Sequence, residues 1–357
     1  MPAATSCVER AGRWFLESGI QEPGGGVARY YLASEKRYLP VSTEITGYAA
    51  SAYAYLYQVT GAAVYLEAAR RTTHFLTQKV WNPDLQTFPF ESGVRSPGYF
   101  FDCGIIVRGL LAVWRQTGEP ELLETAAACG RSMARDYLTP DAIHPVISLP
   151  ERTPWPYEKR WSREPGCFQL KSAMAWRALA RVTGEPEFLE YWERALRMAL
   201  DNHEEFLPGS EDPEKVMDRL HAYSYFMEAL LSEAGRQECD SALGVAIGRT
   251  TRYLREIAPC FARSDVYAQL LRARIHAASL GVSTLEEAAA LEEAAAVASF
   301  QFESKDRRLD GGFCFGRKPE GLLPFANPVS TAFCLQALEM WRQYKGGSFS
   351  PDLEVLI

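Results

Sequence analysis

Apolar side chains recur every three or four residues along most of the chain, the spacing of a helix with one buried face. The clearest periodic segments come in neighbouring pairs, at residues 48–59 and 63–78, 103–116 and 120–137, and 170–182 and 186–200. The spacing continues at residues 221–233, 237–257, 265–280, 285–300 and 328–344. An N-terminal helix, about Thr5 to Ser18, lacks a neighbouring partner, so we expect it to dock against the last helix. The pattern predicts twelve helices in six pairs.

Three similar stretches join the clearest pairs: Gln58–Glu67, Gln116–Glu124 and Val182–Glu190. Each contains a Thr-Gly step whose glycine suits the left-handed residue that ends a helix, at Gly61, Gly118 and Gly184. In two of them a proline suits the first position of the next helix, at Pro120 and Pro186. The threonines lie 57 and 66 residues apart, so the repeating unit is a helical hairpin with a long return loop.

The two helices of a predicted hairpin differ in composition. Helices after a Thr-Gly step carry charge on one face, at Arg70, Arg71, Glu124, Arg131, Glu193 and Arg197. Helices before it are rich in alanine, glycine and serine, for example at residues 47–54 and 172–180. Small residues allow close packing, whereas charge favours contact with water. The sequence therefore predicts an inner and an outer helical layer.

Composition limits the choice of partners and compartment. The chain has 357 residues, 47% of them hydrophobic, and a net charge of −7 without a basic stripe, which argues against a nucleic-acid partner. It contains no signal-peptide pattern and no apolar run of the roughly 20 residues that span a membrane. We therefore expect one domain over residues 1–357, soluble and cytoplasmic. The oligomeric state stays open.

Cysteine and histidine spacing gives no metal signal. The eight cysteines form no C-x-x-C pair and the five histidines no H-x-x-x-H pair, so buried free thiols are expected and zinc is not. Acidic residues alone can bind Ca²⁺, but no D-x-D-x-D loop is present. The sequence therefore predicts neither a metal nor a cofactor.

This arrangement of paired helices resembles the six-hairpin (α/α)6 toroid along essentially the whole chain, which implies an all-α fold with short β-hairpins or lid loops at the mouth of a funnel. By this resemblance the inner helices all begin at the mouth. Their starts match signatures of a largely uncharacterised bacterial toroid group from glycan-related loci: E-x-T-G-Y at Glu44, F-D-x-G-x-x-x-R-G-L-L at Phe101, K-x-x-x-A-W at Lys171 and H-x-x-x-Y at His221.

Polar residues at these starts are the candidate catalysts and sugar contacts. The acid–base candidates are Glu44, Asp102, His221 and Asp265, although Asp102, Asp265 and Thr43 are equally well explained as helix caps. The candidate substrate-binding residues are Tyr48, Tyr99, Arg108, Trp155, Trp161, Lys171, Tyr223, Arg263 and Phe313. Several of these are aromatic side chains in long loops, which suit pyranose rings but also suit plain hydrophobic packing.

The leading hypothesis is a carbohydrate-active enzyme, a glycoside hydrolase, polysaccharide lyase or sugar or uronate epimerase, that acts on a saccharide by acid–base chemistry. One alternative is a non-catalytic glycan-binding or scaffold toroid, whose carboxylates only cap helices. Another is an isoprenoid toroid of the terpene cyclase or prenyltransferase kind, but the chain has no D-x-D-D or aspartate-rich diphosphate motif.

Overall fold

The computed structural model describes residues 6–91 and 96–357. The described chain falls into two compact units. Unit I comprises residues 21–28 and 40–204, and unit II comprises residues 6–20, 29–39 and 205–357. A single domain over the whole chain stays a prediction.

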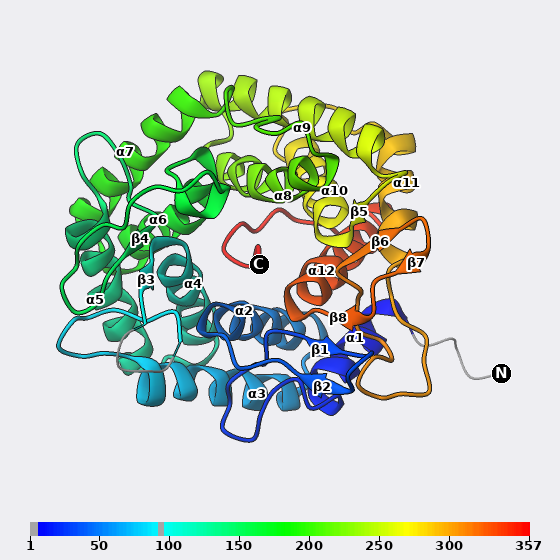
Figure 1. Ribbon diagram of the computed structural model, residues 1–357, viewed down its shortest axis with the longest axis horizontal. Helices are drawn as coiled ribbons and strands as arrows, with labels where there is room; N and C mark the ends of the chain where they lie inside the picture. The colour runs from blue at the N-terminus through cyan, green and yellow to red at the C-terminus, as the bar shows by residue number, and fades with distance from the viewer. Residues whose placement is uncertain (1–5, 92–95) are drawn as a thin grey trace. The chain divides into compact units, whose positions relative to one another are not determined.

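Unit I consists of three helical hairpins (Figure 1). Their helices are α2 (Thr43–Thr60) with α3 (Ala63–Phe75), α4 (Phe100–Thr117) with α5 (Pro120–Tyr137), and α6 (Leu170–Thr183) with α7 (Pro186–Asn202). Helix α3 runs on into a π-helical turn, Leu76–Val80. Besides its hairpin partner, α4 packs against both α2 and α6, which makes these three helices the inner layer of the unit.

The Thr-Gly corners are confirmed as helix ends. Gly61, Gly118 and Gly184 have φ values of 69°, 68° and 74°, in the left-handed region, and each ends its helix through a backbone N–H bond to a carbonyl four residues earlier. Pro120 and Pro186 occupy the first turn of α5 and α7, as expected.

Glycine lets the inner helices of unit I approach closely. A Cβ atom on Gly109 of α4 would lie 2.4 Å from the backbone oxygen of Gly47 in α2. A Cβ atom on Gly104 would lie 2.5 Å from the backbone oxygen of Ser172 in α6. Neither distance is tolerable for real atoms, so the predicted close packing of small residues is confirmed at both contacts.

Unit II contains the other six described helices. They are α1 (Cys7–Glu17), α8 (Pro213–Leu230), α9 (Gln237–Ile257), α10 (Ser264–Ser279), α11 (Glu287–Ala298) and α12 (Pro328–Lys345). Helix α8 pairs with α9 and α10 with α11, while α10 also packs against α8 and α12. The expected docking of the N-terminal helix on the last one is confirmed by the α1–α12 contact; Thr5 lies outside the described residues.

One predicted helix start is wrong. Helix α8 begins at Pro213, eight residues before His221, and not near His221 itself. Asp212 caps it by accepting a hydrogen bond from the Glu214 amide, and Pro213 occupies the first turn. The first turn of α8 is exposed and polar, so it shows no apolar periodicity from which a helix could be recognised.

Short antiparallel strands lie in the segments that connect the helices. In unit II, β1 (Tyr31–Leu32) pairs with β2 (Arg37–Tyr38) and with β8 (Phe325–Ala326), and β5 (Ala262–Arg263) pairs with β6 (Gly316–Lys318), which continues to β7 (Gly321–Leu322). In unit I, β3 (Gly98–Tyr99) pairs with β4 (Val146–Ile147). The pairing of β1 with β2 shows that the fold contains short β-hairpins, as the resemblance implied. Short 3-10 turns lie at Trp161–Arg163, Cys167–Gln169 and Leu231–Glu233.

All eight cysteines are free thiols, and six of them are buried. Cys7 is only partly buried and Cys260 is exposed, so the expectation of burial is wrong for these two. Among the described residues no helix is both long and apolar enough to cross a bilayer.

Candidate functional site

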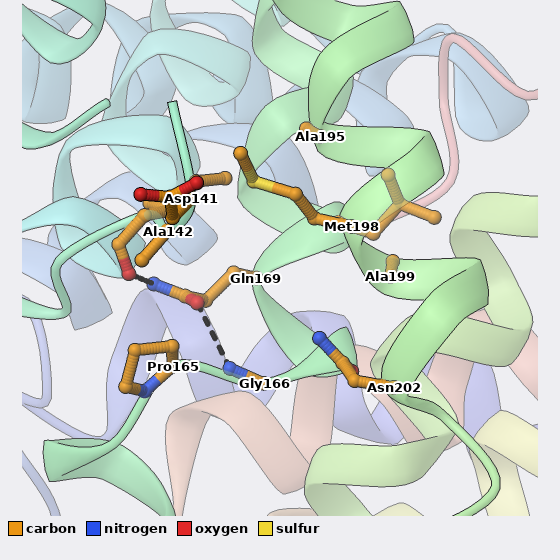
Figure 2. A pocket seen from close by; sticks show the side chains of 11 residues that line it. Asp141, Ala142, Pro165, Gly166, Gln169, Ala195, Met198, Ala199 and Asn202 are labelled. Carbon is orange, nitrogen blue, oxygen red and sulfur yellow. Dashed lines mark hydrogen bonds between the residues drawn. The ribbon is translucent and has the colours of Figure 1, made fainter. Parts of the chain in front are cut away.

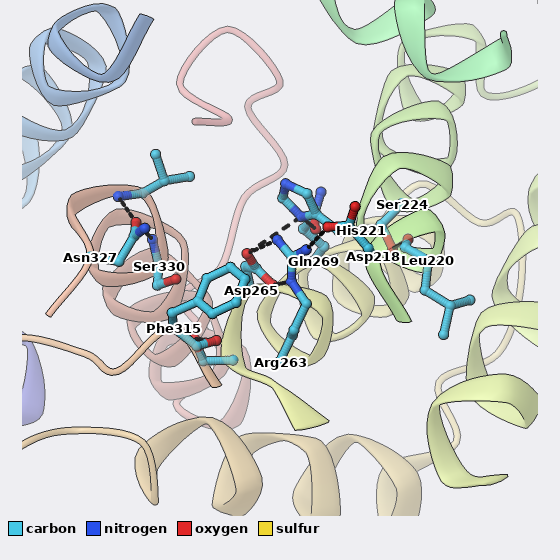
Figure 3. Close-up of polar contacts among 12 residues, drawn as sticks. Asp218, Leu220, His221, Ser224, Arg263, Asp265, Gln269, Phe315, Asn327 and Ser330 are labelled. Atoms are coloured by element: carbon cyan, nitrogen blue, oxygen red, sulfur yellow. Dashed lines mark hydrogen bonds and ion pairs between the residues drawn. The ribbon is translucent and has the colours of Figure 1, made fainter. Parts of the chain in front are cut away.

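A polar cluster in unit II centres on His221, two turns into α8. The imidazole is only 7% exposed, and its Nδ1 lies 2.9 Å from Oε1 of Gln269 and 3.5 Å from Oδ2 of Asp265. Both partners belong to α10, where they are four residues apart and therefore share one helical face. Figure 3 shows these contacts. The α8–α10 packing thus brings a base and two oxygen acceptors together.

The carboxylate of Asp265 is held by an arginine from the adjoining strand. Arg263, at the end of β5, donates from Nε to Oδ1 at 3.0 Å and from Nη2 to Oδ2 at 2.7 Å. Its Nη1 reaches Oδ1 of Asp218 at 2.5 Å, and its guanidinium lies 4.4 Å from the ring centre of Phe315. Burial acts to raise the pKa of Asp265, but the charge of Arg263 outweighs it, and the pKa is lowered. Asp265 is therefore ionised at neutral pH.

The same surroundings keep His221 neutral. Burial lowers the pKa of the imidazole below its ordinary 6.5, although the Asp265 charge opposes this effect. Because Gln269 Oε1 and Asp265 Oδ2 are both acceptors, Nδ1 carries the proton. Nε2 then presents a lone pair. Within the described residues Nε2 forms no hydrogen bond, and it is not among the fully enclosed polar atoms.

Aromatic rings line one side of His221. Tyr225, one turn further along α8, lies with its ring centre 4.6 Å from the imidazole, and Phe333 of α12 lies at 6.4 Å. Tyr223, which was predicted as a substrate contact, is fully buried and stacks on Phe206 at 6.1 Å. Two residues along a helix correspond to nearly opposite faces, so the structure brings His221 together with Tyr225 and not with Tyr223.

Phe313, predicted as a sugar contact, is also fully buried in unit II. Its backbone amide donates to Oγ1 of Thr331 in the first turn of α12 at 2.9 Å. The side chain of Asn327 caps that helix by accepting from the amides of Val329 and Ser330. The loop before α12 is thus fastened to the helix that it precedes.

The explanation as helix caps is wrong for Thr43 and Asp102 in unit I and for Asp265 in unit II. The residues at the N-cap positions are Ser42, Tyr99 and Arg263. Thr43 is the first residue of α2, and its hydroxyl donates to the backbone oxygens of Pro89 and Phe90. These placements leave the Asp102 and Asp265 carboxylates inside the first helical turn. For Asp265, the positive end of the helix dipole there favours the ionised form.

Four further predicted residues of unit I lie on its three inner helices. Glu44 and Arg108 are half-buried, Tyr48 is 2% exposed, and Lys171 is fully buried. Glu44 and Lys171 sit in the first turns of α2 and α6, whereas Arg108 lies two turns into α4. These starts belong to helices that pack side by side in the order α2, α4, α6.

A short ribbon in unit I brings Tyr99, which precedes α4, together with Trp155 and Tyr157 of the long loop before α6. Tyr99 of β3 is register-paired with Val146 of β4, and on the other edge of β4 the amide of Trp155 donates to the Val146 oxygen at 3.0 Å. Further along, the Tyr157 hydroxyl lies 2.8 Å from Nδ1 of His144. We call β3, β4 and residues 153–157 the aromatic ribbon.

Arg163 lies over this ribbon and was not predicted from the sequence. Its guanidinium carbon is 5.5 Å from the ring centre of Tyr99 and 4.7 Å from that of Trp155. Trp161, which was predicted, instead packs edge-on against Phe168 at 5.1 Å. The only sequence signal for Arg163 is a positive charge among prolines and aromatics in an unusually long loop, and that signal does not single out one arginine.

A cavity of about 40 Å³ lies elsewhere in unit I, between the long loop and the start of α6 and the end of α7 (Figure 2). Gln169 fastens the loop there, because its Nε2 donates to the Ile143 oxygen at 2.9 Å and its Oε1 accepts from the Gly166 amide at 3.0 Å. None of the predicted site residues lines this cavity. Across residues 6–91 and 96–357, no three histidine, cysteine or acidic side chains are grouped to hold a metal ion.

Comparisons with known proteins find similarity in solved structures only: no family model and no curated protein matches the chain. A sugar epimerase from a ruminal bacterium matches with a TM-score of 0.69 and 10% identity, over 94% of this chain and 99% of that one. Cellobiose 2-epimerase from Spirochaeta thermophila matches with a TM-score of 0.69 and 16% identity, over 91% and 92%.

An unsaturated glucuronyl hydrolase from Streptococcus agalactiae also matches, with a TM-score of 0.69 and 10% identity, over 98% of this chain and 92% of that one. At such low identity the likeness is one of fold. The chain has the all-α, six-hairpin (α/α)6 toroid fold that its sequence predicted.

Proposed function

We propose that the protein is a carbohydrate-active enzyme that transfers a proton at a carbon of its sugar, as an epimerase or isomerase does, with His221 as the acid–base group. The observation that carries this proposal is the fixed imidazole: Gln269 and Asp265 hold Nδ1, and Nε2 is left for a substrate proton. The similarity in fold to a sugar epimerase and to cellobiose 2-epimerase supports the choice of sugar chemistry.

The proposed step needs a neutral base. His221 Nε2 takes the proton from the carbon next to the carbonyl of an open-chain sugar, the C–H electron pair moves into the enolate, and the carbonyl oxygen receives the negative charge. Asp265 stabilises the imidazolium that forms, because it lies 3.5 Å from Nδ1 and keeps its own charge. Return of the proton to the opposite face of the same carbon, after the enolate has rotated against His221, gives the epimer. When a proton moves instead from the neighbouring hydroxyl to the enolate oxygen, return of the first proton to the former carbonyl carbon gives the isomer.

Hydrolysis of a glycosidic bond finds less support in this cluster. It ordinarily requires one protonated carboxyl group with a raised pKa beside one ionised carboxylate. The pKa of Asp265 is lowered, and both its oxygens are engaged by Arg263. Glu44 and Asp102, on α2 and α4, stay proposed acid–base residues for either chemistry.

The test is exchange of sugar-bound hydrogen with solvent. Reducing mono- and disaccharides are incubated with the protein in D₂O, and deuterium at C2 is followed by NMR. His221→Asn should lower the exchange rate at least a hundredfold, within the range typical of general-base catalysis. His74→Asn, at an exposed position on α3, is the matched control and should leave the rate unchanged.

An exchange rate in the His221→Asn protein equal to that of the wild type would remove His221 from the reaction. Sugars that bind tightly but neither exchange nor turn over would favour the non-catalytic glycan-binding alternative.

A further inference from the structure

We infer that the aromatic ribbon of unit I is a binding subsite for the carboxylate of an acidic saccharide, with Arg163 as the anion-binding group. This inference rests on the proposed function only in taking the ligand to be a sugar. It assigns to that sugar a charged group, which the His221 chemistry by itself does not require.

The ribbon places its two rings at the right separation for one guanidinium. Tyr99 and Trp155 lie on opposite edges of β4, each opposite Val146, so both project from the same face. Neighbouring strands are about 4.8 Å apart, so the two side chains are separated by about 10 Å. The Arg163 guanidinium carbon, 5.5 Å from one ring centre and 4.7 Å from the other, fills this gap.

Arg163 is held by these rings and not by an acid. Within the described residues its guanidinium forms no hydrogen bond or ion pair, and its Nη1 is fully enclosed without a partner. Nε and Nη2 are not among the enclosed atoms, so they are open to a ligand. These two N–H groups lie on one edge of the guanidinium plane, where they match the two oxygens of a carboxylate.

The surrounding charges do not favour a doubly charged anion. Burial raises the pKa of Tyr99, and the charges that act on its hydroxyl are those of Arg163, Asp102, Arg160 and Glu158. Two of these are positive and two negative, so the surroundings carry no net positive charge. A phosphate dianion would therefore meet more repulsion here than a single carboxylate that contacts Arg163.

A polar pair beside the ribbon can contact sugar hydroxyls. The Tyr157 hydroxyl and His144 Nδ1 lie 2.8 Å apart, and Tyr157 is 50% exposed. Burial lowers the pKa of His144, so its imidazole is neutral at pH 7 and adds no charge to the subsite. A hexuronate therefore finds a cation for its carboxylate, aromatic edges for its ring and neutral polar groups for its hydroxyls.

The test is a binding measurement that needs no turnover. Isothermal titration with D-glucuronate, D-glucose and inorganic phosphate is carried out on the wild type, on Arg163→Met and on Arg163→Lys. Arg197→Met, at an exposed position on α7, removes the same charge from unit I and is the matched control.

The wild type should bind glucuronate more tightly than glucose or phosphate. Arg163→Met should weaken glucuronate binding at least tenfold while changing glucose binding less than twofold, and Arg197→Met should change neither. Arg163→Lys keeps the positive charge but lacks the planar fork, so its affinity for glucuronate should lie between those of the wild type and Arg163→Met. This variant also tests the subsite if Arg163→Met folds poorly.

Three results would overturn the subsite: glucuronate binding that does not exceed glucose binding, equal losses for both sugars on removing Arg163, or preferential binding of phosphate. Failure of the proposed function looks different. Glucuronate would then bind through Arg163 as expected, while no sugar would show exchange that depends on His221.

Discussion

Nδ1 of His221 lies 2.9 Å from Oε1 of Gln269, a contact between two helices that joins residues 48 positions apart in sequence. The amide of glutamine can present either oxygen or nitrogen to a histidine, and each choice fixes a different tautomer. Asp265 Oδ2, 3.5 Å from the same Nδ1, accepts only and therefore selects the Nδ1–H form. The free base on Nε2 follows from this pair of acceptors.

Replacing Gln269 tests whether it positions that base. Gln269→Met keeps the volume and removes the acceptor, so we expect kcat to fall about 10- to 100-fold with little change in KM. The Gln269 bond also acts to raise the pKa of His221, so its loss should move the acid limb of the kcat profile to lower pH. Gln237→Met, at an exposed position on α9, is the control, and an unshifted pH profile with unchanged kcat would contradict the role.

Stability should depend on pH through His221. Its folded-state pKa lies below the ordinary 6.5, so between these two values the unfolded chain binds more protons than the folded one. The contribution is fully present above about pH 6.5 and is lost as pH falls through the folded pKa. We expect the free energy of unfolding, measured by urea titration, to decrease below pH 6.5.

His221→Gln should flatten this part of the profile, and the exposed His74→Gln should leave it unchanged. Equal slopes in the wild type and His221→Gln between pH 5 and 6.5 would show that the imidazole is not held neutral by the fold.

Titration of Glu293 on α11 should change the free energy of unfolding with pH in the opposite direction. Burial raises its pKa from 4.5 to about 7, although Arg274 Nε lies 2.8 Å from its Oε1. Because the folded state holds the proton more tightly, the contribution is present below pH 4.5 and is lost as pH rises towards 7. The Glu293→Gln variant should therefore gain about 2 to 3 kcal/mol relative to the wild type between pH 5 and pH 8.

Guanidinium titrations at the two pH values measure this difference directly. Glu292→Gln, at the neighbouring exposed glutamate, is the control. A constant gap between Glu293→Gln and the wild type across that range would mean that Glu293 stays ionised in the fold.

Two glycines of α4 and its corner should differ sharply in their tolerance of alanine. At Gly118 a Cβ atom would meet nothing within 4 Å, so only the left-handed backbone, with φ of 68°, opposes substitution. Gly118→Ala should cost about 1 kcal/mol. At Gly104 the added atom would lie 2.5 Å from the Ser172 oxygen, so Gly104→Ala should cost about 3 kcal/mol or more by forcing α4 away from α6.

Thermal and urea unfolding of both variants measure these costs. Similar losses at the two positions would show that the α4–α6 contact yields easily to an added methyl group.

The candidate site was only partly accessible from the sequence. His221, Asp265 and Arg263 were selected as polar residues near predicted helix starts, and the structure brings these three together. Gln269 was missed, although it lies one turn after Asp265 on the same helical face, which is a usable signal. Asp218 was missed because the start of α8 was placed too late, so that the residue fell outside the predicted helix.

The sequence alone determined the helical hairpins, their corners and the distinction between inner and outer helices. These features are local: left-handed glycines, first-turn prolines and apolar periodicity act within a few residues of chain. Only the tertiary structure decided which side chains meet. Helices and strands distant in sequence pack together to pair His221 with Gln269 and to place Arg163 between Tyr99 and Trp155. No local pattern encodes that packing.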